Sequence, residues 1–204
     1  MLNKLLYHMT HINNIPSIVK SNGLYSHSLI HKKSVSYQDV ANIDIQDKRG
    51  QKIVPISPGG NLHDYVPFYF APRSPMLYAI VNGGISQEEI VYFMTNTQNV
   101  HRDENNYVFT DSHAIMRLTN FYSNLQDLDQ IDWDIMQSKY WHDHIDYPNR
   151  KMKRQAEFLI YNQLSMSSCI GFAVYNKEAE LKLRKILNDL DQDIFIGIRP
   201  DYFF

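Results

Sequence analysis

The sequence has little cysteine and no long apolar run. Cys169 is its one cysteine, which excludes an internal disulfide framework and a cysteine-based structural zinc site. No stretch approaches the roughly 18 apolar residues of a transmembrane helix, and the apolar run at the start is too short for a signal peptide. We therefore expect a cytoplasmic protein with no membrane partner, in which Cys169 is a small buried side chain rather than a reactive thiol.

Two common nucleotide-binding motifs are also missing. The sequence contains neither G-x-G-x-x-G nor G-x-x-x-x-G-K-[ST], which argues against a Rossmann dinucleotide fold and a P-loop NTPase. Its 20 Lys and Arg residues nearly balance 22 Asp and Glu residues, for a formal net charge of -2. A polyanionic partner would have to be held by a local basic patch, so composition alone neither proposes nor excludes nucleic acid.

The composition that is present fits one folded domain. The chain has 204 residues, of which 44% are hydrophobic and 13% aromatic, so it can bury a sizeable core. No repeat, low-complexity tract or linker divides it. We expect a single domain over residues 1–204 that acts as a monomer.

Short strands are predicted to alternate with short helices. Apolar and β-branched runs predict strands, while a spacing of three to four residues predicts helices near residues 15–21 and 75–82, over 177–189 and between 125 and 135. The predicted strands cover residues 5–9, 65–70, 90–94, 107–110, 157–161, 170–175 and 194–198. Because this order contains no regular βαβ repeat, it favours an α+β fold over a doubly wound parallel sheet.

Three local features refine this prediction. Asn14 is expected to cap the first helix with its side chain, and Ser74 the helix that begins at Pro75. Pro67 predicts that its strand is an edge or bulged strand. Residues 26–53 are polar and have no clean period, and a segment of this length in a compact domain is more often functional or mobile than a connector.

Polar residues at two places could hold a nucleotide. His8 and Thr10 lie on the same side of a strand end, where they could grip a ribose or an amide, although ordinary strand-end polar groups explain them as well. Arg49 lies in the irregular segment beside Lys48, and its planar guanidinium could hold a diphosphate. A solvated surface pair is the competing interpretation of Lys48-Arg49.

Glu157 begins an apolar strand directly after a basic run. An unpaired carboxylate at the head of a buried strand is costly, so this position indicates function. Four of the five residues from Arg150 to Arg154 are cationic. The combination suits an enzyme that acts on a polyanion, whereas a solvated charge run is the simpler explanation of the basic residues. His142 and His144 have no third ligand at a helpful spacing, so we expect no metal.

Three segments together resemble the DarT-type DNA ADP-ribosyltransferase toxins. They are residues 7–12 (YHMTHI), 61–78 (NLHDYVPFYFAPRSPMLY) and 155–161 (QAEFLIY), and the central block is highly specific. The resemblance runs nearly end to end and implies an ADP-ribosyltransferase fold with a split, mainly antiparallel sheet and short flanking helices. It implies transfer of ADP-ribose from NAD to a base in single-stranded DNA, in a sequence-dependent way, with release of nicotinamide. We prefer thymidine to guanosine as that base, and the partner implied is a macrodomain antitoxin, DarG.

The resemblance also assigns roles by position. It implies that Arg49 and Glu157 are catalytic, that residues 32–53 pack over the dinucleotide, and that residues 113–157 present DNA. The one visible departure is Lys48, where the family would have a first arginine before the essential one. The implied NAD-binding residues are His8, Met9, Thr10, Ser17, Tyr25, Arg49, Tyr69 and Met76, and the implied DNA-binding residues are His113, Arg150, Lys151, Lys153, Arg154 and Gln155.

Three alternatives remain open at this point. A mono-ADP-ribosyltransferase that modifies protein or RNA would need the same NAD chemistry. A catalytically silent DNA-binding relative could keep only the fold, and an interaction domain would have no NAD pocket.

Overall fold

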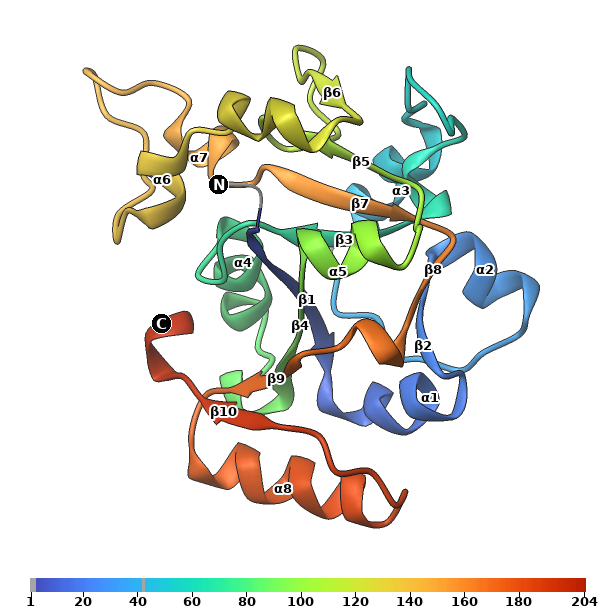
Figure 1. The fold of residues 1–204 in the computed structure, drawn as a ribbon. Coiled ribbons are helices and arrows are strands. Elements are labelled where there is room, and N and C mark those ends of the chain that lie inside the picture. The colour runs from blue at the N-terminus through green and yellow to red at the C-terminus, as the bar shows by residue number, and fades with distance from the viewer. Residues whose placement is uncertain (1–2, 42) are drawn as a thin grey trace.

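The computed structural model describes residues 3–41 and 43–204 and contains a central sheet of eight strands (Figure 1). The strand order is β10-β9-β4-β1-β3-β7-β5-β6, and only β9 and β10 pair in parallel. A separate pair joins β2 (Gly23–Tyr25) to β8 (Gln163–Ser165). The strands of the main sheet are β1 (Leu5–His11), β3 (Tyr65–Tyr69), β4 (Ile90–Asn96), β5 (Tyr107–Thr110), β6 (Phe121–Tyr122), β7 (Glu157–Tyr161), β9 (Gly171–Val174) and β10 (Ile196–Ile198).

The sheet is split between β1 and β3. These two neighbours share one register pair, Tyr7 opposite Tyr69, whereas β1 pairs with β4 and β3 pairs with β7 along their whole lengths. The sheet therefore consists of two halves, β10-β9-β4-β1 and β3-β7-β5-β6, that meet at a single point. The expected α+β class with a split, mainly antiparallel sheet is confirmed.

Pro67 lies beside this split, which corrects its assignment to an edge or bulged strand. Its strand β3 is an interior strand, and Pro67 stands opposite Leu159 of β7. Nδ1 of His8 lies 2.8 Å from the carbonyl oxygen of Pro67, so that carbonyl faces β1. In an antiparallel strand the N and C=O of one residue face the same side. The missing N–H of Pro67 therefore faces the gap, where no ladder bond is lost.

Eight α-helices are described, and most are short. Their bounds are α1 (Ile15–Lys20), α2 (His27–Lys32), α3 (Ile43–Gln51), α4 (Pro75–Asn82), α5 (Thr97–Arg102), α6 (Trp133–Gln137), α7 (Arg150–Lys153) and α8 (Lys177–Asn188). Six 3-10 turns accompany them: η1 (Ile12–Asn14), η2 (Leu62–Asp64), η3 (Gln87–Glu89), η4 (Leu125–Gln130), η5 (Met166–Ser168) and η6 (Pro200–Tyr202). Ser74 caps α4 as expected, by accepting a bond from the backbone N–H of Leu77.

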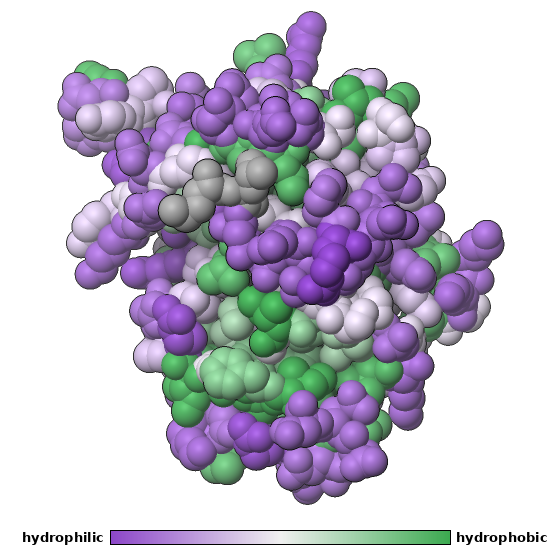
Figure 2. Space-filling model, in the orientation of Figure 1, coloured by the Kyte–Doolittle hydropathy of each residue, from purple (hydrophilic) through white to green (hydrophobic). Residues whose placement is uncertain are grey.

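The core lies on both faces of the sheet because side chains alternate along each strand. On β4, Val91 and Phe93 point to the face covered by α1 and α8, while Tyr92 points to the face covered by α4. No helix in the described parts of the chain is long and apolar enough to cross a membrane. In the view of Figure 2, hydrophilic residues dominate the surface and apolar residues gather below its middle.

The irregular segment predicted at residues 26–53 contains α2 and α3. These helices show no apolar period in the sequence because α2 has no buried residue and α3 buries only Arg49. Asn14 corrects a second expectation. It stands at the N-cap position of α1, but its side chain makes no capping bond there and binds Thr10 and Gln38 instead.

Candidate active site

A cavity of about 180 Å³ opens where the sheet splits. Strand β1 contributes one wall, α3 and the segment before it contribute another, and β3 and α4 close the end. Of the predicted NAD-binding residues, Ser17 alone is not part of the wall; its Oγ donates to the carbonyl of Ser36 at 3.0 Å. The others line the cavity together: His8, Met9, Thr10, Tyr25, Arg49, Tyr69 and Met76.

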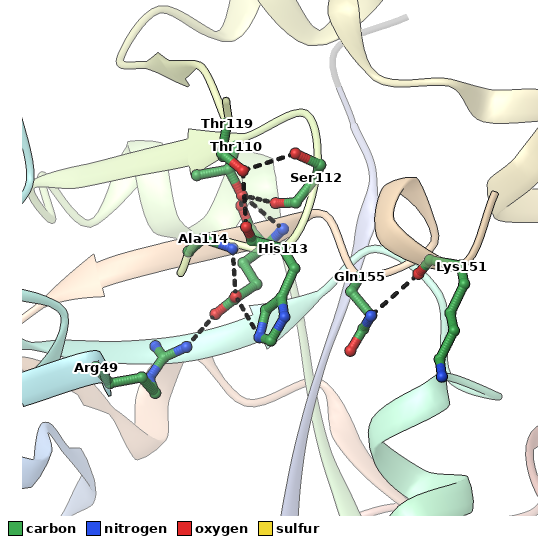
Figure 3. A network of polar contacts seen from close by, with 9 residues as sticks. Arg49, Thr110, Ser112, His113, Ala114, Thr119, Lys151 and Gln155 are labelled. Carbon is green, nitrogen blue, oxygen red and sulfur yellow. Dashed lines mark hydrogen bonds and ion pairs between the residues drawn. The ribbon is translucent and has the colours of Figure 1, made fainter. Parts of the chain in front are cut away.

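Glu157 and Arg49 form an ion pair beside this cavity (Figure 3). Nη1 of Arg49 donates to Oε2 of Glu157 at 2.7 Å, and the backbone N–H of Ala114 donates to Oε1 at 3.0 Å. The Glu157 side chain is fully buried, and Arg49 is 8% exposed. The carboxylate at the head of β7 is thus compensated, which explains how a charged residue is tolerated there.

Glu157 lies behind the cavity wall rather than in it. Arg49 and His113 belong to the wall, and Nε2 of His113 lies 3.8 Å from Oε1 of Glu157. Among the residues described, Nη2 of Arg49 is buried without a hydrogen-bond partner. A diphosphate in the cavity could satisfy this nitrogen, because guanidinium groups bind phosphate oxygens through paired N–H bonds.

The loop that carries His113 is held by hydroxyl groups. Oγ1 of Thr110 accepts the N–H of Glu157 at 3.1 Å and donates to the carbonyl of Ser112 at 2.7 Å. Oγ1 of Thr119 donates to the carbonyl of His113 at 2.7 Å and contacts Oγ of Ser112 at 2.8 Å (Figure 3). This network fixes the loop against the start of β7, so His113 is placed by more than one bond.

The imidazoles of the site are neutral at pH 7. Burial lowers the pKa of His8 to about 4, and its bond to Pro67 opposes this shift only in part. Burial also lowers the pKa of His113, although the charge of Glu157 acts in the opposite direction. Burial, and then the charge of Glu157, raise the pKa of Tyr69 well above its ordinary value. Arg49 therefore supplies the positive charge that the cavity wall presents among these residues.

Two histidines at the cavity were missed by sequence reasoning. The rings of His27 and His63 contact each other at a tilt of 30°, with centroids 3.9 Å apart, and both line the cavity that Arg49 also lines. Burial, with the neighbouring His63 and His31, lowers the pKa of His27 to about 4. The two residues are far apart in the chain and have no ligand spacing, so the only sequence signal was the position of His63 inside the block at residues 61–78.

Apart from His113, which lines the cavity, the predicted DNA-binding residues divide into two groups. Arg150, Lys151, Lys153 and Gln155 lie on or beside α7 at the surface, directly before Glu157. Arg150 donates to Oγ of Ser138 and the carbonyl of Tyr140, and Gln155 donates to the carbonyl of Lys151 (Figure 3). Lys153 pairs with an aspartate at 3.0 Å, whereas Lys151 is exposed.

Arg154 belongs to the other group and corrects its assignment to phosphate contact. It is 4% exposed, and the two N–H groups of its Nη1 are shared among three backbone carbonyls, those of Ile135, Met136 and Ser138, at 2.6, 2.6 and 3.0 Å. Nη2 donates to the carbonyl of Arg73 at 3.3 Å. The guanidinium is therefore occupied in holding the backbone at residues 135–138 and does not reach the surface.

A metal site has no support from the side chains in residues 3–41 and 43–204. No group of three or more His, Cys, Asp or Glu residues in these ranges is placed to hold a metal ion. Cys169 is partly buried against the core, and burial raises the pKa of its thiol to about 12.

Comparisons with known proteins agree with this geometry. The family model described as "ssDNA thymidine ADP-ribosyltransferase, DarT" matches residues 7–204. A DNA ADP-ribosyl transferase of Thermus sp. (strain 2.9) is 38% identical over 205 residues, which cover 98% of this chain and 95% of the relative. A DNA ADP-ribosyl transferase-DNA ADP-ribosyl glycohydrolase fusion protein of Thermosipho africanus is 26% identical over 201 residues, covering 98% of this chain and 49% of the fusion protein.

Solved structures match over the same length. Thermus sp. 2.9 DarT in complex with ADP-ribosylated ssDNA superposes with a TM-score of 0.91 at 36% identity, covering 98% of this chain and 96% of that one. The same protein in complex with NAD+ gives a TM-score of 0.86 at 34% identity, covering 98% of both chains. The family match over nearly the whole chain, together with these relatives, shows that the chain belongs to the DarT family of DNA ADP-ribosyltransferases.

Proposed function

We propose that this protein transfers ADP-ribose from NAD⁺ to thymidine in single-stranded DNA and releases nicotinamide. The observation that carries the proposal is the Arg49–Glu157 pair at the wall of a cavity lined by β1 residues. The thymidine assignment is supported by the description of the matching family model. The structures of the Thermus relative with NAD+ and with ADP-ribosylated ssDNA support both substrates.

NAD⁺ would bind in the cavity at the split of the sheet. His8, Tyr69 and Met76 lie at the end where nicotinamide would sit, and Arg49 would hold the diphosphate. The unpartnered Nη2 of Arg49 supports this role, because a buried guanidinium N–H without an acceptor is costly. A carboxylate oxygen accepts more than one hydrogen bond, so Oε2 of Glu157 could accept from the ribose while Nη1 of Arg49 stays bound to it.

Glu157 would then stabilise the charge that develops during transfer. The bond between nicotinamide and the ribose C1 breaks, its electron pair leaves with the pyridine nitrogen, and C1 acquires oxocarbenium character. A hydrogen bond from the adjacent ribose hydroxyl to Glu157 strengthens as this charge builds. The attacking ring nitrogen of the base loses its proton, and Glu157 orients or deprotonates that base. Arg49 favours the deprotonated base electrostatically, because a guanidinium group holds its protons too firmly to act as a general base.

The DNA strand would cross the surface that begins at α7. Arg150, Lys151 and Lys153 of α7 would meet phosphates. His113, whose Nε2 lies 3.8 Å from Oε1 of Glu157, would help to position the base. A single strand is the easier substrate because no base has to be pulled from a duplex. Phosphate contacts of this kind weaken as the salt concentration rises.

The experiment that tests the proposal is incubation with labelled NAD⁺ and matched oligonucleotides. We expect labelling of single strands that contain thymidine, weaker labelling of the same sequence as a duplex, and a modified thymidine after digestion to nucleosides. Varying the neighbours of that thymidine measures the sequence dependence. Modified guanosine would correct the base, and label found only on protein or RNA would favour the alternative transferase. NAD⁺ that is never consumed would favour the silent DNA-binding relative.

The partner follows from the same chemistry. A macrodomain antitoxin of the DarG type would hydrolyse the new glycosidic bond, and the Thermosipho protein, in which a transferase and a glycohydrolase are fused, supports this pairing. We propose that this chain acts in the cytoplasm as a monomer. Addition of a purified macrodomain hydrolase should release the label from DNA, and light scattering should give the mass of one chain.

A further inference from the structure

The side chain of Asn14 binds the backbone of one distant residue, Gln38, through two hydrogen bonds. Its Oδ1 accepts the N–H of Gln38 at 2.6 Å, and its Nδ2 donates to the carbonyl of Gln38 at 2.8 Å. The second N–H of Nδ2 is taken by Oγ1 of Thr10 at 3.0 Å. Asn14 is 7% exposed and borders the cavity, but both of its donors are occupied, so it acts through Gln38 rather than on a ligand.

The segment that Asn14 holds forms one wall of the cavity. Residues 35–40 adopt neither helix nor strand, yet residues 37–41 line the cavity. Irregular backbone keeps one conformation only where side chains or packing hold it. Ser17 adds a weaker attachment through the carbonyl of Ser36, and Asn13 contacts only the side chain of Gln38.

The same segment is connected to Arg49. Asp39 directly follows Gln38, and its Oδ1 accepts the N–H of Ala41 at 2.8 Å. Its Oδ2 accepts a bond from Nε2 of Gln46 at 3.0 Å, and Gln46 lies on α3, one turn before Arg49. The position of Gln38 is therefore linked, through Asp39 and Gln46, to α3, the helix that carries Arg49.

We propose that Asn14 is a positioning residue that pre-orders residues 36–41, and through them α3, for NAD⁺. The inference rests on the proposed function, because it assigns NAD⁺ to this cavity. A wall that is ordered before binding spares the ligand the entropy of ordering it, so the effect falls on NAD⁺ affinity. The chemical step, which uses Glu157, is unaffected once NAD⁺ is bound.

The test compares Asn14→Ala, Asn14→Asp and the control Asn13→Ala. Asn14→Asp keeps the size and the acceptor but turns a carboxylate oxygen toward the carbonyl of Gln38. Both Asn14 variants should raise the KM for NAD⁺ about tenfold, the size expected for losing a buried bidentate contact, with kcat changed less than twofold. Asn13→Ala should behave as the unaltered protein, because it leaves the backbone of Gln38 held.

Hydrogen exchange distinguishes a local loss of order at Gln38 from a general loss of stability. The amide of Gln38 should lose its protection in both Asn14 variants, while the amide of Tyr92 in the centre of β4 keeps it. Unchanged KM after Gln38 has lost protection would overturn the proposal, as would an equal loss in kcat and KM. If Asn14→Ala does not fold, Asn14→Asp decides by the same criteria.

Failure of the inference can be separated from failure of the proposed function. Calorimetric titration of the unaltered protein with NAD⁺, without DNA, should show binding. No binding at all would remove the proposed function and this inference together. Binding of equal strength to the unaltered protein and to both Asn14 variants would remove only the role of Asn14.

Discussion

The guanidinium of Arg49 and the carboxylate of Glu157 meet at 2.7 Å although 108 residues separate them in the chain. The carboxylate is fully buried, the Arg49 side chain is 9% exposed, and each charge compensates the other. Two residues that are both expected to touch NAD⁺ therefore touch each other in its absence. Because Nη1 of Arg49 holds Glu157, we expect the diphosphate of NAD⁺ to bind Nη2, which has no partner among the described residues.

Replacing Glu157 by Gln should separate chemistry from folding. The amide keeps the size of the side chain and the bond from Ala114, but it cannot stabilise a cationic sugar. We expect the rate of DNA labelling to fall by ~10²–10³, the usual effect of removing one such electrostatic interaction. Initial rates with labelled NAD⁺ measure this loss.

The Glu157→Gln protein should also melt at a lower temperature, because Arg49 is left buried without its counter-charge. Breaking a buried pair costs about 3–5 kcal/mol. Circular dichroism at the assay temperature confirms that the variant is folded. Labelling at the normal rate by this folded variant would disprove the catalytic role of Glu157.

Gly50 offers a test of how closely α3 must approach the cavity wall. A Cβ at this position would lie 3.1 Å from the ring of His63, which is tighter than ordinary contact. Gly50→Ala should push α3 and His63 apart and raise the KM for NAD⁺ several-fold, while the helical propensity of alanine partly offsets the loss of stability. Gln51→Ala, next to it on the same helix and exposed, is the matched control. Equal KM values for the two variants would contradict the prediction.

His8 should make the stability of the protein depend on pH. Its pKa is about 4 in the folded protein, against an ordinary value of 6.5. Between these values the unfolded chain binds a proton that the folded protein does not, so the free energy of unfolding falls as pH falls from 6.5 to 4 and then levels off. At about 1.4 kcal/mol for each pKa unit, and with some exposure of the ring to the cavity, the loss is roughly 2–3 kcal/mol.

The variant His8→Asn isolates this contribution, since its amide can still donate to the carbonyl of Pro67. Urea unfolding of both proteins at pH 7, 5.5 and 4 measures the difference. The unaltered protein should lose more stability in acid than His8→Asn does. Parallel losses in the two proteins would show that other groups cause the acid sensitivity.

Alanine substitution should affect stability at Arg154 and binding of single-stranded DNA at Lys151. Arg154→Ala removes the donor from four backbone carbonyls, of which only that of Ile135 keeps another among the described residues, the N–H of Ser138. It should destabilise the protein by about 3–5 kcal/mol, since each unsatisfied buried carbonyl is costly. Lys151→Ala removes an exposed side chain and should change stability by less than about 0.5 kcal/mol. It should instead weaken binding of single-stranded DNA and reduce the salt slope by about 0.7. An Arg154→Ala protein of normal stability with a reduced salt slope would restore the phosphate role to Arg154.

The parts of the fold that were predictable are those with a clear apolar period. Strands β5 and β7 occur where apolar and β-branched runs predicted them. Helix α4 starts where Ser74 and Pro75 predicted it, and α8 starts where the spacing of its apolar residues predicted it. Helix α3 was not predictable from its own pattern, because it has no apolar face and buries a charged residue. Pro67 was read as an edge signal because the sequence cannot show that the sheet opens beside it.

The candidate site was accessible mainly through the resemblance to DarT-type toxins. Glu157 carried a local signal, since a carboxylate began a buried strand, but nothing near it in the sequence pointed to Arg49. The ring contact of His27 with His63 and the hydrogen bonds of Asn14 to Gln38 join distant segments, so no periodic pattern in the sequence predicts them. Arg154 was grouped with its basic neighbours because charge alone does not distinguish a surface arginine from a buried one.

The two halves of the sheet, which meet at the single register pair between β1 and β3, contribute different residues to the site. The half that contains β1 contributes His8, Met9 and Thr10 to the cavity, and the other half contributes Tyr69 of β3. Glu157, His113 and the basic run also belong to strands and loops of this second half. Of the residues in the loops 113–119 and 138–149, His113 alone lines the cavity. We therefore expect that the choice of acceptor base can change through these loops while the other cavity residues, which would bind NAD⁺, stay the same. A chimaera that takes these two loops from a relative with another target base should exchange its acceptor while consuming the same dinucleotide.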